Sequence, residues 1–201
     1  MLTIVTPAQH RRLTTPAAVR EALGITDEDA ELLPAIERAS AAIEAWCGRV
    51  FAREVVRETW LPTRAQWSLQ LSRWPVFDVV EVIEDGRTVA SANYELDAAT
   101  GILRRLWCGH HASWMACRIE VEYAAGYVLP GDDGRDLPAD IEDACVRTVA
   151  AAREGIKRDP AVRRIGVGDG GKIDVTFDTS AGALPPAAVA LLQHYRCPAL
   201  A

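Results

Sequence analysis

The spacing of the apolar residues changes twice along this 201-residue chain. Over residues 15–48, and again over 138–155, apolar residues recur at the three- and four-residue spacing that buries one face of a helix. Between Arg53 and Tyr123 they alternate instead, in short runs that Gly, Asp and Asn interrupt. Consecutive strands with such short links pair antiparallel, because a parallel pair needs a long crossover. The sequence therefore predicts an α+β protein, a small helical bundle with an inserted antiparallel β subdomain.

Capping signals place the ends of the two N-terminal helices. Thr15, followed by a proline, starts the first helix. Thr26, with Asp29 three residues later, resembles a capping box that starts a second helix ending at Gly48. Pro34 is expected to kink this helix or to separate its first turn, because proline lacks the backbone N–H that a helix needs.

Six strands are predicted in the alternating region, with tight turns at Asp85-Gly86 and Thr100-Gly101. The strands are Val55–Leu61, Ser68–Leu71, Val79–Glu84, Tyr94–Asp97, Ile102–Leu106 and Arg118–Tyr123. A third helix starts at Pro138, and Pro185-Pro186 starts a last one. Three segments follow from this order. Residues 1–52 form N-terminal helices, 53–130 the β subdomain, and 131–201 C-terminal helices that pack with 1–52 as one helical domain.

The charge balance limits the functions open to the chain. With 28 acidic and 22 basic side chains, the formal net charge is -6. A protein that binds nucleic acid by coating its phosphates needs clustered Lys and Arg, so this class is disfavoured. No apolar run is long enough to cross a membrane, and the N-terminus lacks the pattern of an export signal. We expect a soluble protein that stays inside the cell, with its five cysteines as reduced thiols.

Charge changes sign along the C-terminal part of the chain. Residues 132–143 carry six acidic groups and one Arg, whereas basic residues outnumber acidic ones over 147–172. Acidic side chains stabilise a helix N-terminus, so the solvated start of the third helix explains the first run. The Arg-rich run would suit a DNA-binding regulator with salt-dependent affinity for duplex DNA, an affinity that we expect to be weak or absent.

A glycine-rich segment, Gly166–Lys172, has the spacing of two phosphate-binding motifs. Such a loop must lead into a helix whose N-terminal amides hold the anion, and it needs Ser or Thr after the Lys. Ile173 stands there instead, and its alternation with Val175 and Phe177 predicts a strand. The segment is interpreted as a glycine loop that precedes a strand.

Two further sets of residues could carry chemistry or recognition. The Cys/His cluster consists of Cys108, His110, His111 and Cys117. Its spacing matches no structural zinc pattern, so it is interpreted as an exposed loop; a metal-dependent hydrolase that uses this segment, 108–117, together with the acidic 132–143 is the rival hypothesis. The six tryptophans are expected to be core or interface anchors rather than a platform for nucleic-acid bases. They are Trp46, Trp60, Trp67, Trp74, Trp107 and Trp114.

Several short segments follow one another in a characteristic order. They are Ala45–Arg49 with Phe51, Glu58–Pro62, Leu71–Val76, Val79 with Val82 and Asp85-Gly86, Tyr94–Asp97, Gly101–Leu103, Val121–Tyr127 and Leu137-Pro138 with Ala144. In this order they resemble the head–tail connector (adaptor) proteins of tailed bacteriophages, prophages and gene transfer agents. The likeness covers about residues 13–155, with an echo at Leu191–Arg196.

The resemblance implies a structural virion protein at the head–tail junction. The resemblance implies a twelvefold ring beneath the portal protein, which extends the DNA channel and docks a tail-side stopper or terminator protein. The resemblance implies no catalytic residue, no cofactor and no membrane, and DNA passes without specific binding. Assembly would take place in the host bacterial cytoplasm. Another joining protein, a stopper or a tail terminator, is the alternative within the same class.

Two groups of residues are expected to act in such a ring. A channel that DNA must traverse is better lined with acidic or neutral groups, and Asp132, Asp133 and Asp136 are the candidates. The segment Pro185–Ala201 is expected to insert into the portal. Its interface residues are Leu191, Leu192, Tyr195 and Arg196. The acidic and basic stretches could also meet between neighbouring copies, because a ring contact joins two different patches of one surface.

Overall fold

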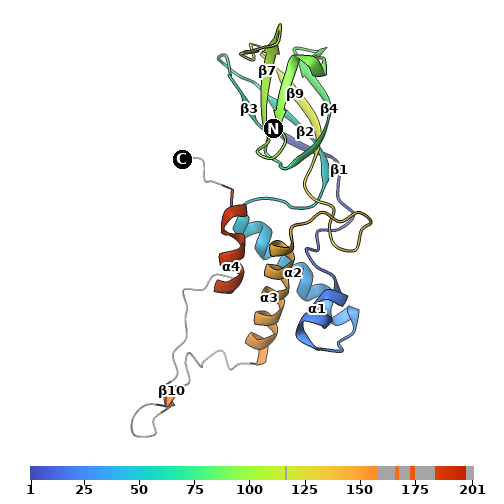
Figure 1. Cartoon of the computed structure of the whole chain (residues 1–201), viewed down its shortest axis with the longest axis vertical. Helices are drawn as coiled ribbons and strands as arrows, with labels where there is room; N and C mark the ends of the chain where they lie inside the picture. Colours follow the sequence, from blue (N-terminus) through green and yellow to red (C-terminus); the bar gives the residue numbers. More distant parts are fainter. Residues whose placement is uncertain (116, 158–165, 168–172, 175–183, 198–201) are drawn as a thin grey trace. The chain divides into compact units, whose positions relative to one another are not determined.

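The alternating segment forms two antiparallel sheets in the computed structural model, which describes residues 1–115, 117–157, 166–167, 173–174 and 184–197 (Figure 1). One sheet has the strand order β1-β2-β9-β4-β5; the other has the order β3-β7-β6, with β8 paired to β7. The strands are β1 (Leu2–Thr6), β2 (Glu54–Trp60), β3 (Leu69–Gln70), β4 (Val76–Glu84), β5 (Arg87–Thr88), β6 (Tyr94–Asp97), β7 (Ile102–Trp107), β8 (His110–Ala112) and β9 (Ile119–Ala125). All six predicted strands are present, and the α+β class is confirmed.

The core of this β unit comes from the strict alternation of β9, whose odd-numbered residues are buried. Tyr123 lies across from Val56 of β2 and Val79 of β4, which continues one row of inward side chains over three strands. Trp114 and Leu103 add to the same core and are fully buried. Alternate side chains point outward, and there Arg57 of β2 pairs with Glu122 of β9.

Two hairpin turns use consecutive residues with positive φ. Asp85 and Gly86, at 46° and 79°, join β4 to β5 as predicted. Cys108 and Gly109, at 49° and 78°, join β7 to β8 in the same way. Two consecutive residues with positive φ match the right-handed twist of the flanking strands. The Cys/His segment, interpreted from sequence as an exposed loop, is therefore a tight turn followed by a short strand.

The N-terminal residues differ from the sequence expectation. They were assigned to the helical segment 1–52, but Leu2–Thr6 forms β1 and pairs antiparallel with β2. This stretch is rich in β-branched residues, and the tertiary structure supplies a partner strand, which outweighs its place next to the helices. Met1–His10 accordingly groups with Val50–Val128, whereas Arg11–Arg49 groups with Leu129–Ala201 in a helical unit.

The helical unit contains α1 (Pro16–Leu23), α2 (Asp29–Cys47), α3 (Ala139–Lys157) and α4 (Pro186–Leu192), followed by a short 3-10 turn (Gln193–Tyr195). The Thr15 hydroxyl accepts the Ala18 N–H at 3.2 Å, as its predicted capping role requires. The predicted capping box is wrong, because α2 begins after Glu28 and no side chain caps it. Pro34 lies inside α2, where it does not separate the first turn.

Helix α3 holds the helical unit together, because α1, α2 and α4 all contact it. A buried polar contact marks its packing against α2: the Ser40 hydroxyl accepts the Leu13 N–H at 3.0 Å and lies 3.6 Å from the Cys145 thiol. Leu32, Ile36 and Ile43 of α2 are fully buried at helical spacing. The predicted apolar face of α2 is thus confirmed.

Candidate interaction surfaces

The acidic segment 132–143 divides into an exposed loop and a locally neutralised helix start. Asp132, Asp133 and Asp136, the expected channel residues, are all exposed in the loop that precedes α3. On α3 itself, Glu142 forms an ion pair with Arg135 at 3.0 Å, and Asp143 forms one with Arg147 at 2.9 Å. The exposed carboxylates of this segment therefore include three in the loop and Asp140 in the first turn of α3.

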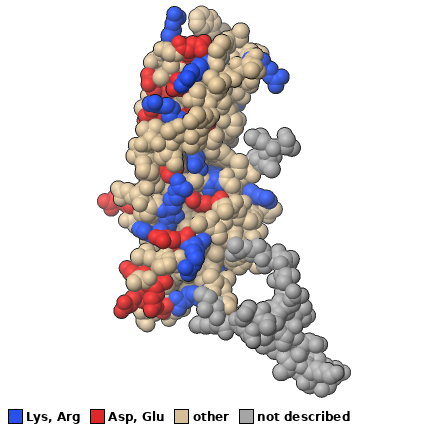
Figure 2. Space-filling view, turned by 180° about the vertical axis from the view of Figure 1, so that it is seen from behind, with Lys and Arg blue, Asp and Glu red and all other residues tan. Residues whose placement is uncertain are grey.

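A second acidic surface lies where α1 connects to α2. Acidic atoms gather there at the lower end of the helical unit (Figure 2). Glu21, Glu28 and Glu31 are exposed. Two further carboxylates of the connection, Asp27 and Asp29, are paired with Arg153 and Arg20.

The expected portal-binding residues differ in accessibility. Leu192 is fully buried in the helical unit, whereas Leu191 and Tyr195 are half-buried and Arg196 is exposed. The Arg196 guanidinium lies 5.4 Å from the centre of the Trp46 ring, and the Cys197 N–H donates to the Cys47 carbonyl at 2.8 Å. The end of α2 therefore holds the residues that follow α4, a contact between distant parts of the sequence that no local pattern indicates.

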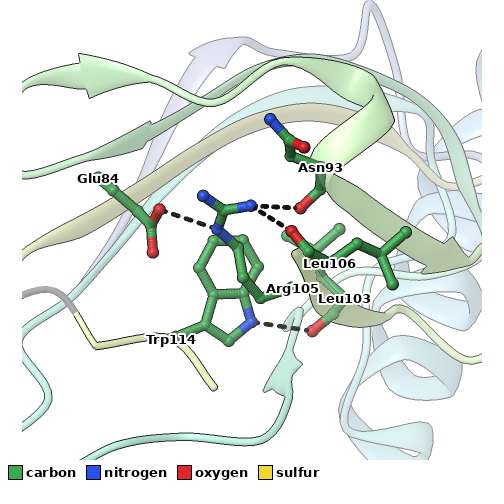
Figure 3. Close-up of polar contacts among 6 residues, drawn as sticks. All are labelled: Glu84, Asn93, Leu103, Arg105, Leu106 and Trp114. Carbon is green, nitrogen blue, oxygen red and sulfur yellow. Dashed lines mark hydrogen bonds and ion pairs between the residues drawn. The ribbon is translucent and has the colours of Figure 1, made fainter. Parts of the chain in front are cut away.

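One ion pair in the β unit links three elements (Figure 3). Arg105 of β7 donates from Nε to Glu84 of β4 at 2.9 Å, and from Nη1 to the carbonyls of Asn93 and Leu106, both at 2.7 Å. The side chains of Arg105 and Glu84 are only 14% and 19% exposed. In this shielded position an ion pair with additional hydrogen bonds fixes geometry more firmly than a surface pair does.

Trp114 forms the floor under this ion pair. Its ring centre lies 5.8 Å from the Arg105 guanidinium, and its indole N–H donates to the Leu103 carbonyl at 3.4 Å. A buried tryptophan whose N–H has a partner is satisfied as a core residue. This confirms a core role for one of the six tryptophans.

Two other tryptophans, Trp67 and Trp107, are exposed, and Trp107 borders a groove. Trp107 and Met115, 66% and 77% exposed, border a groove of about 430 Å³ above the Arg105–Glu84 pair. Leu61 borders a second groove of about 390 Å³ beside the exposed Trp67, and both side chains are 71% exposed. Exposed apolar side chains gathered around a groove are typical of protein-binding surfaces. Sequence alternation alone does not distinguish them from the buried Trp114.

The Cys/His segment 108–117 lies beside the Trp107 groove, which its residues Ala112, Ser113 and Met115 help to line. Nε2 of His111, on β8, lies 2.9 Å from a carboxylate oxygen of Glu95. Within the described part of the chain, no three His, Cys, Asp or Glu residues are placed to hold a metal ion. In the glycine-rich segment, residues 168–172 lie outside the described residues. The segment begins with β10 (Gly166–Val167), which pairs antiparallel with β11 (Ile173–Asp174), so a strand starts after Lys172 as expected. Val175 and Phe177, which the same prediction included, lie outside the described residues.

Two thiols are shielded from solvent in the helical unit. Burial raises the pKa of Cys145 to about 12, with a smaller opposing effect from the Ser40 hydroxyl. Burial likewise raises the pKa of Cys47 to about 11. Cys108 and Cys117, in contrast, are exposed. None of the helices among the described residues is both long and apolar enough to span a membrane.

Comparison with known proteins identifies the fold. No family model and no curated protein matches the sequence. A chain in the neck of an empty gene transfer agent particle, computed with C6 symmetry, matches at 23% identity and a TM-score of 0.59, covering 98% of this chain and 95% of that one. A chain in the neck of the native particle, computed with C12 symmetry, matches at 22% identity and 0.59. It covers 98% and 94% of the two chains. The fold is thus one found in the neck of these particles.

Proposed function

We propose that this chain is a head–tail connector (adaptor) of a phage-like particle. It forms a ring beneath the portal protein, extends the DNA channel and docks a tail-side stopper or terminator protein. The observation that carries this proposal is the likeness to neck chains over 98% of the sequence, which includes both the helical and the β unit. The order of segments from Ala45 to Leu137 independently points to the same family.

The symmetry of the neck structures that contain the similar chains supports assembly into a ring. The neck structures that contain them were computed with C6 and C12 symmetry. We infer a ring for this chain, twelvefold where it meets a twelvefold portal, assembled in the host bacterial cytoplasm and retained at the head–tail junction of the virion. Small contacts repeated around a ring gain strength from simultaneous binding to one template.

Channel lining is assigned to the exposed acidic loop. Asp132, Asp133 and Asp136 are exposed carboxylates in the loop that precedes α3. Like charges repel the phosphate backbone, so a channel that carries such groups lets DNA slide without binding it. The formal net charge of -6 agrees with this role.

Portal binding is assigned to the accessible residues that end α4. Leu191, Tyr195 and Arg196 remain candidates for the portal interface. Leu192 is fully buried and instead packs in the core of the helical unit. The exposed apolar grooves of the β unit, bordered by Trp107 and by Leu61, are available to the tail-side partner.

The decisive experiment removes the chain from the particle. Particles made without it should be DNA-filled heads that lack tails, and electron microscopy of complete particles should show the chain as a ring between portal and tail. Complete, tailed particles that form without the chain would disprove the connector role.

A narrower test addresses the portal contact. The double variant Tyr195→Ala/Arg196→Ala should lower co-purification with the portal at least about tenfold, since interface anchors of this size each contribute on the order of 1–2 kcal/mol. Gln193→Ala, an exposed position in the same turn, is the matched control and should bind normally. Unchanged portal binding by the double variant would remove these residues from the interface.

A further inference from the structure

Three β-bulges in the five-stranded sheet share one property. Each adds one residue to a strand: Val5 in β1, and Phe77 and Val80 in β4. All three extra residues are apolar, and they are 46%, 69% and 56% exposed. Bulges are built features that re-aim side chains, and large apolar side chains held in water contribute nothing to the core of the monomer.

The bulged strands lie at opposite sides of that sheet. β1 is the edge strand on one side. On the other side, β5 covers only Ile83 and Glu84 of β4. No described strand pairs with Phe77–Glu81 on the side away from β9. Backbone hydrogen bonds from Val76 to Ala98 and from Val89 to Val82, both 2.8 Å, bound this open stretch.

Edge strands of soluble proteins are normally protected by charge, by proline or by a covering segment. The five residues of β1, Leu2–Thr6, carry no charged side chain. In β4, Asp78 and Glu81 are charged, but the apolar side chains of Phe77, next to Asp78, and Val80, next to Glu81, are exposed to solvent. Two apolar edges on one sheet are therefore left for a partner to cover.

We propose that the β1 edge of one copy packs against Phe77–Glu81 of the next copy, with Val5 contacting Val80. This contact rests on the proposed ring, which supplies the second copy. The guanidinium of Arg53 lies 4.2 Å from the centre of the Phe77 ring and holds that ring in place beside the contact.

Sheet topology gives the contact its direction. Each neighbouring pair along β1-β2-β9-β4 is antiparallel, so β1 and β4 run in opposite directions. Copies related by rotation about an axis along the strands keep these directions, and β1 of one copy then meets β4 of the next antiparallel. With Val5 opposite Val80, antiparallel pairing also places Ile4 opposite Glu81 and Thr6 opposite Val79.

A second copy fits these edges better than an unrelated partner does. The two patches are different and lie on opposite sides of one sheet, and contacts between unlike patches close into a ring when rotation repeats them. A nucleic acid would require basic side chains, whereas Asp78 and Glu81 flank the patch on β4. The apolar side chains of both edges instead match each other.

Disulfide trapping in assembled particles tests the contact. Val5→Cys and Val80→Cys are combined in a Cys108→Ser/Cys117→Ser background, which removes the exposed thiols. Mild oxidation should give a ladder of covalent multimers, whereas either single-cysteine variant should give none. The pair Leu61→Cys/Val80→Cys is the control, because Leu61 is more accessible than Val5 but belongs to the groove rather than to an edge.

Opposite charges introduced on the two sides of the contact provide an independent test. Val5→Glu and Val80→Lys should each lower recovery of the chain in particles about tenfold, and the double variant should restore it to within about twofold, because the introduced charges then pair across the contact. Both positions are exposed, and unchanged melting of the purified variants excludes misfolding as the cause.

The outcomes separate this contact from the proposed function. A ring in the particle without a ladder from the Val5/Val80 pair, or without rescue by the double variant, overturns the edge contact and leaves the connector role intact. Complete particles that contain no ring of this chain overturn both.

Discussion

At the scale of single residues, the close approach of two backbone segments at Gly126 determines which residue can stand there. Gly126 follows β9 with a φ of +102°, and its N–H donates to the Pro75 carbonyl at 2.9 Å. A Cβ at this position would lie 2.4 Å from the Ala52 carbonyl oxygen and 2.8 Å from that of Phe51. Backbone atoms cannot retreat as the end of a side chain can, so glycine is required here.

Gly126→Ala should therefore destabilise the protein by about 2–4 kcal/mol, from the backbone clash and the left-handed conformation together. Gly86→Ala is the matched control: its φ is +79°, but a Cβ there meets nothing within 4 Å, so about 1 kcal/mol is expected. Urea unfolding measures both. Equal losses for the two variants would show that the close approach at Gly126 has no energetic weight.

The buried thiols predict how stability depends on pH. The folded-state pKa of Cys145, about 12, and that of Cys47, about 11, lie above the ordinary value of 9.0. A raised pKa contributes stability that is fully present below pH 9 and is lost as pH rises through the folded value, because the unfolded chain releases its proton first. The pKa of Tyr123 is raised by burial and by Glu58 and acts in the same direction.

The free energy of unfolding should thus fall between pH 9 and pH 11. Cys145→Ala should make this fall shallower by up to about 1.4 kcal/mol per pH unit, the effect of one proton. Cys108→Ala, at an exposed thiol, is the control and should leave the slope unchanged. Denaturant titrations at several pH values measure the slopes, and identical slopes for both variants would contradict the shielding of Cys145.

At the scale of elements, the strands were predictable where alternation is long and the turns are marked. Tyr94–Asp97 was predicted at its observed limits, and β2, β4, β7 and β9 lie within a few residues of theirs. The short strands β1, β5 and β8 were not predicted. Two or three residues carry no period of their own, and five residues at the N-terminus pair only because β2 offers an edge.

The Arg105–Glu84 ion pair acts at the scale of elements, because it fixes β4, β7 and the segment before β6 relative to one another. Arg105→Met leaves a shielded carboxylate without its partner and removes donors from two carbonyls, so a loss of about 2–3 kcal/mol is expected. Arg104→Gln, the preceding residue of β7, should change stability by no more than about 0.5 kcal/mol. Thermal or urea unfolding measures the stability of both variants, and similar losses would contradict the role of Arg105 in holding these elements together.

At the scale of the whole molecule, charge predicts behaviour toward DNA. With a formal net charge of -6, the chain should show no saturable binding to duplex DNA at physiological salt. Asp132→Arg/Asp133→Arg/Asp136→Arg brings the net charge to 0 and concentrates the change on one exposed loop, so weak, salt-dependent binding should emerge. Fluorescence anisotropy measures both. Tight binding by the unaltered chain would argue against an acidic lining and for a DNA-binding role of the Arg-rich segment.

The amino-acid sequence by itself determined the class of the fold. Hydrophobic period, capping residues such as Thr15 and turns such as Asp85-Gly86 act over a few neighbouring residues, and these local preferences survive in the structure. The segment order also indicated a fold that chains in the neck of gene transfer agent particles share, because it reflects the arrangement of whole elements rather than any single site.

Only the tertiary structure decided which side chains remain for partners. Trp107 and Trp114 have the same side chain and lie close together in the sequence, yet one is 66% exposed and the other fully buried. Leu192 and Arg196 belong to one predicted interface, but packing against the other helices buries the first and leaves the second beside Trp46. Burial is a property of contacts between distant segments, and no local period records it.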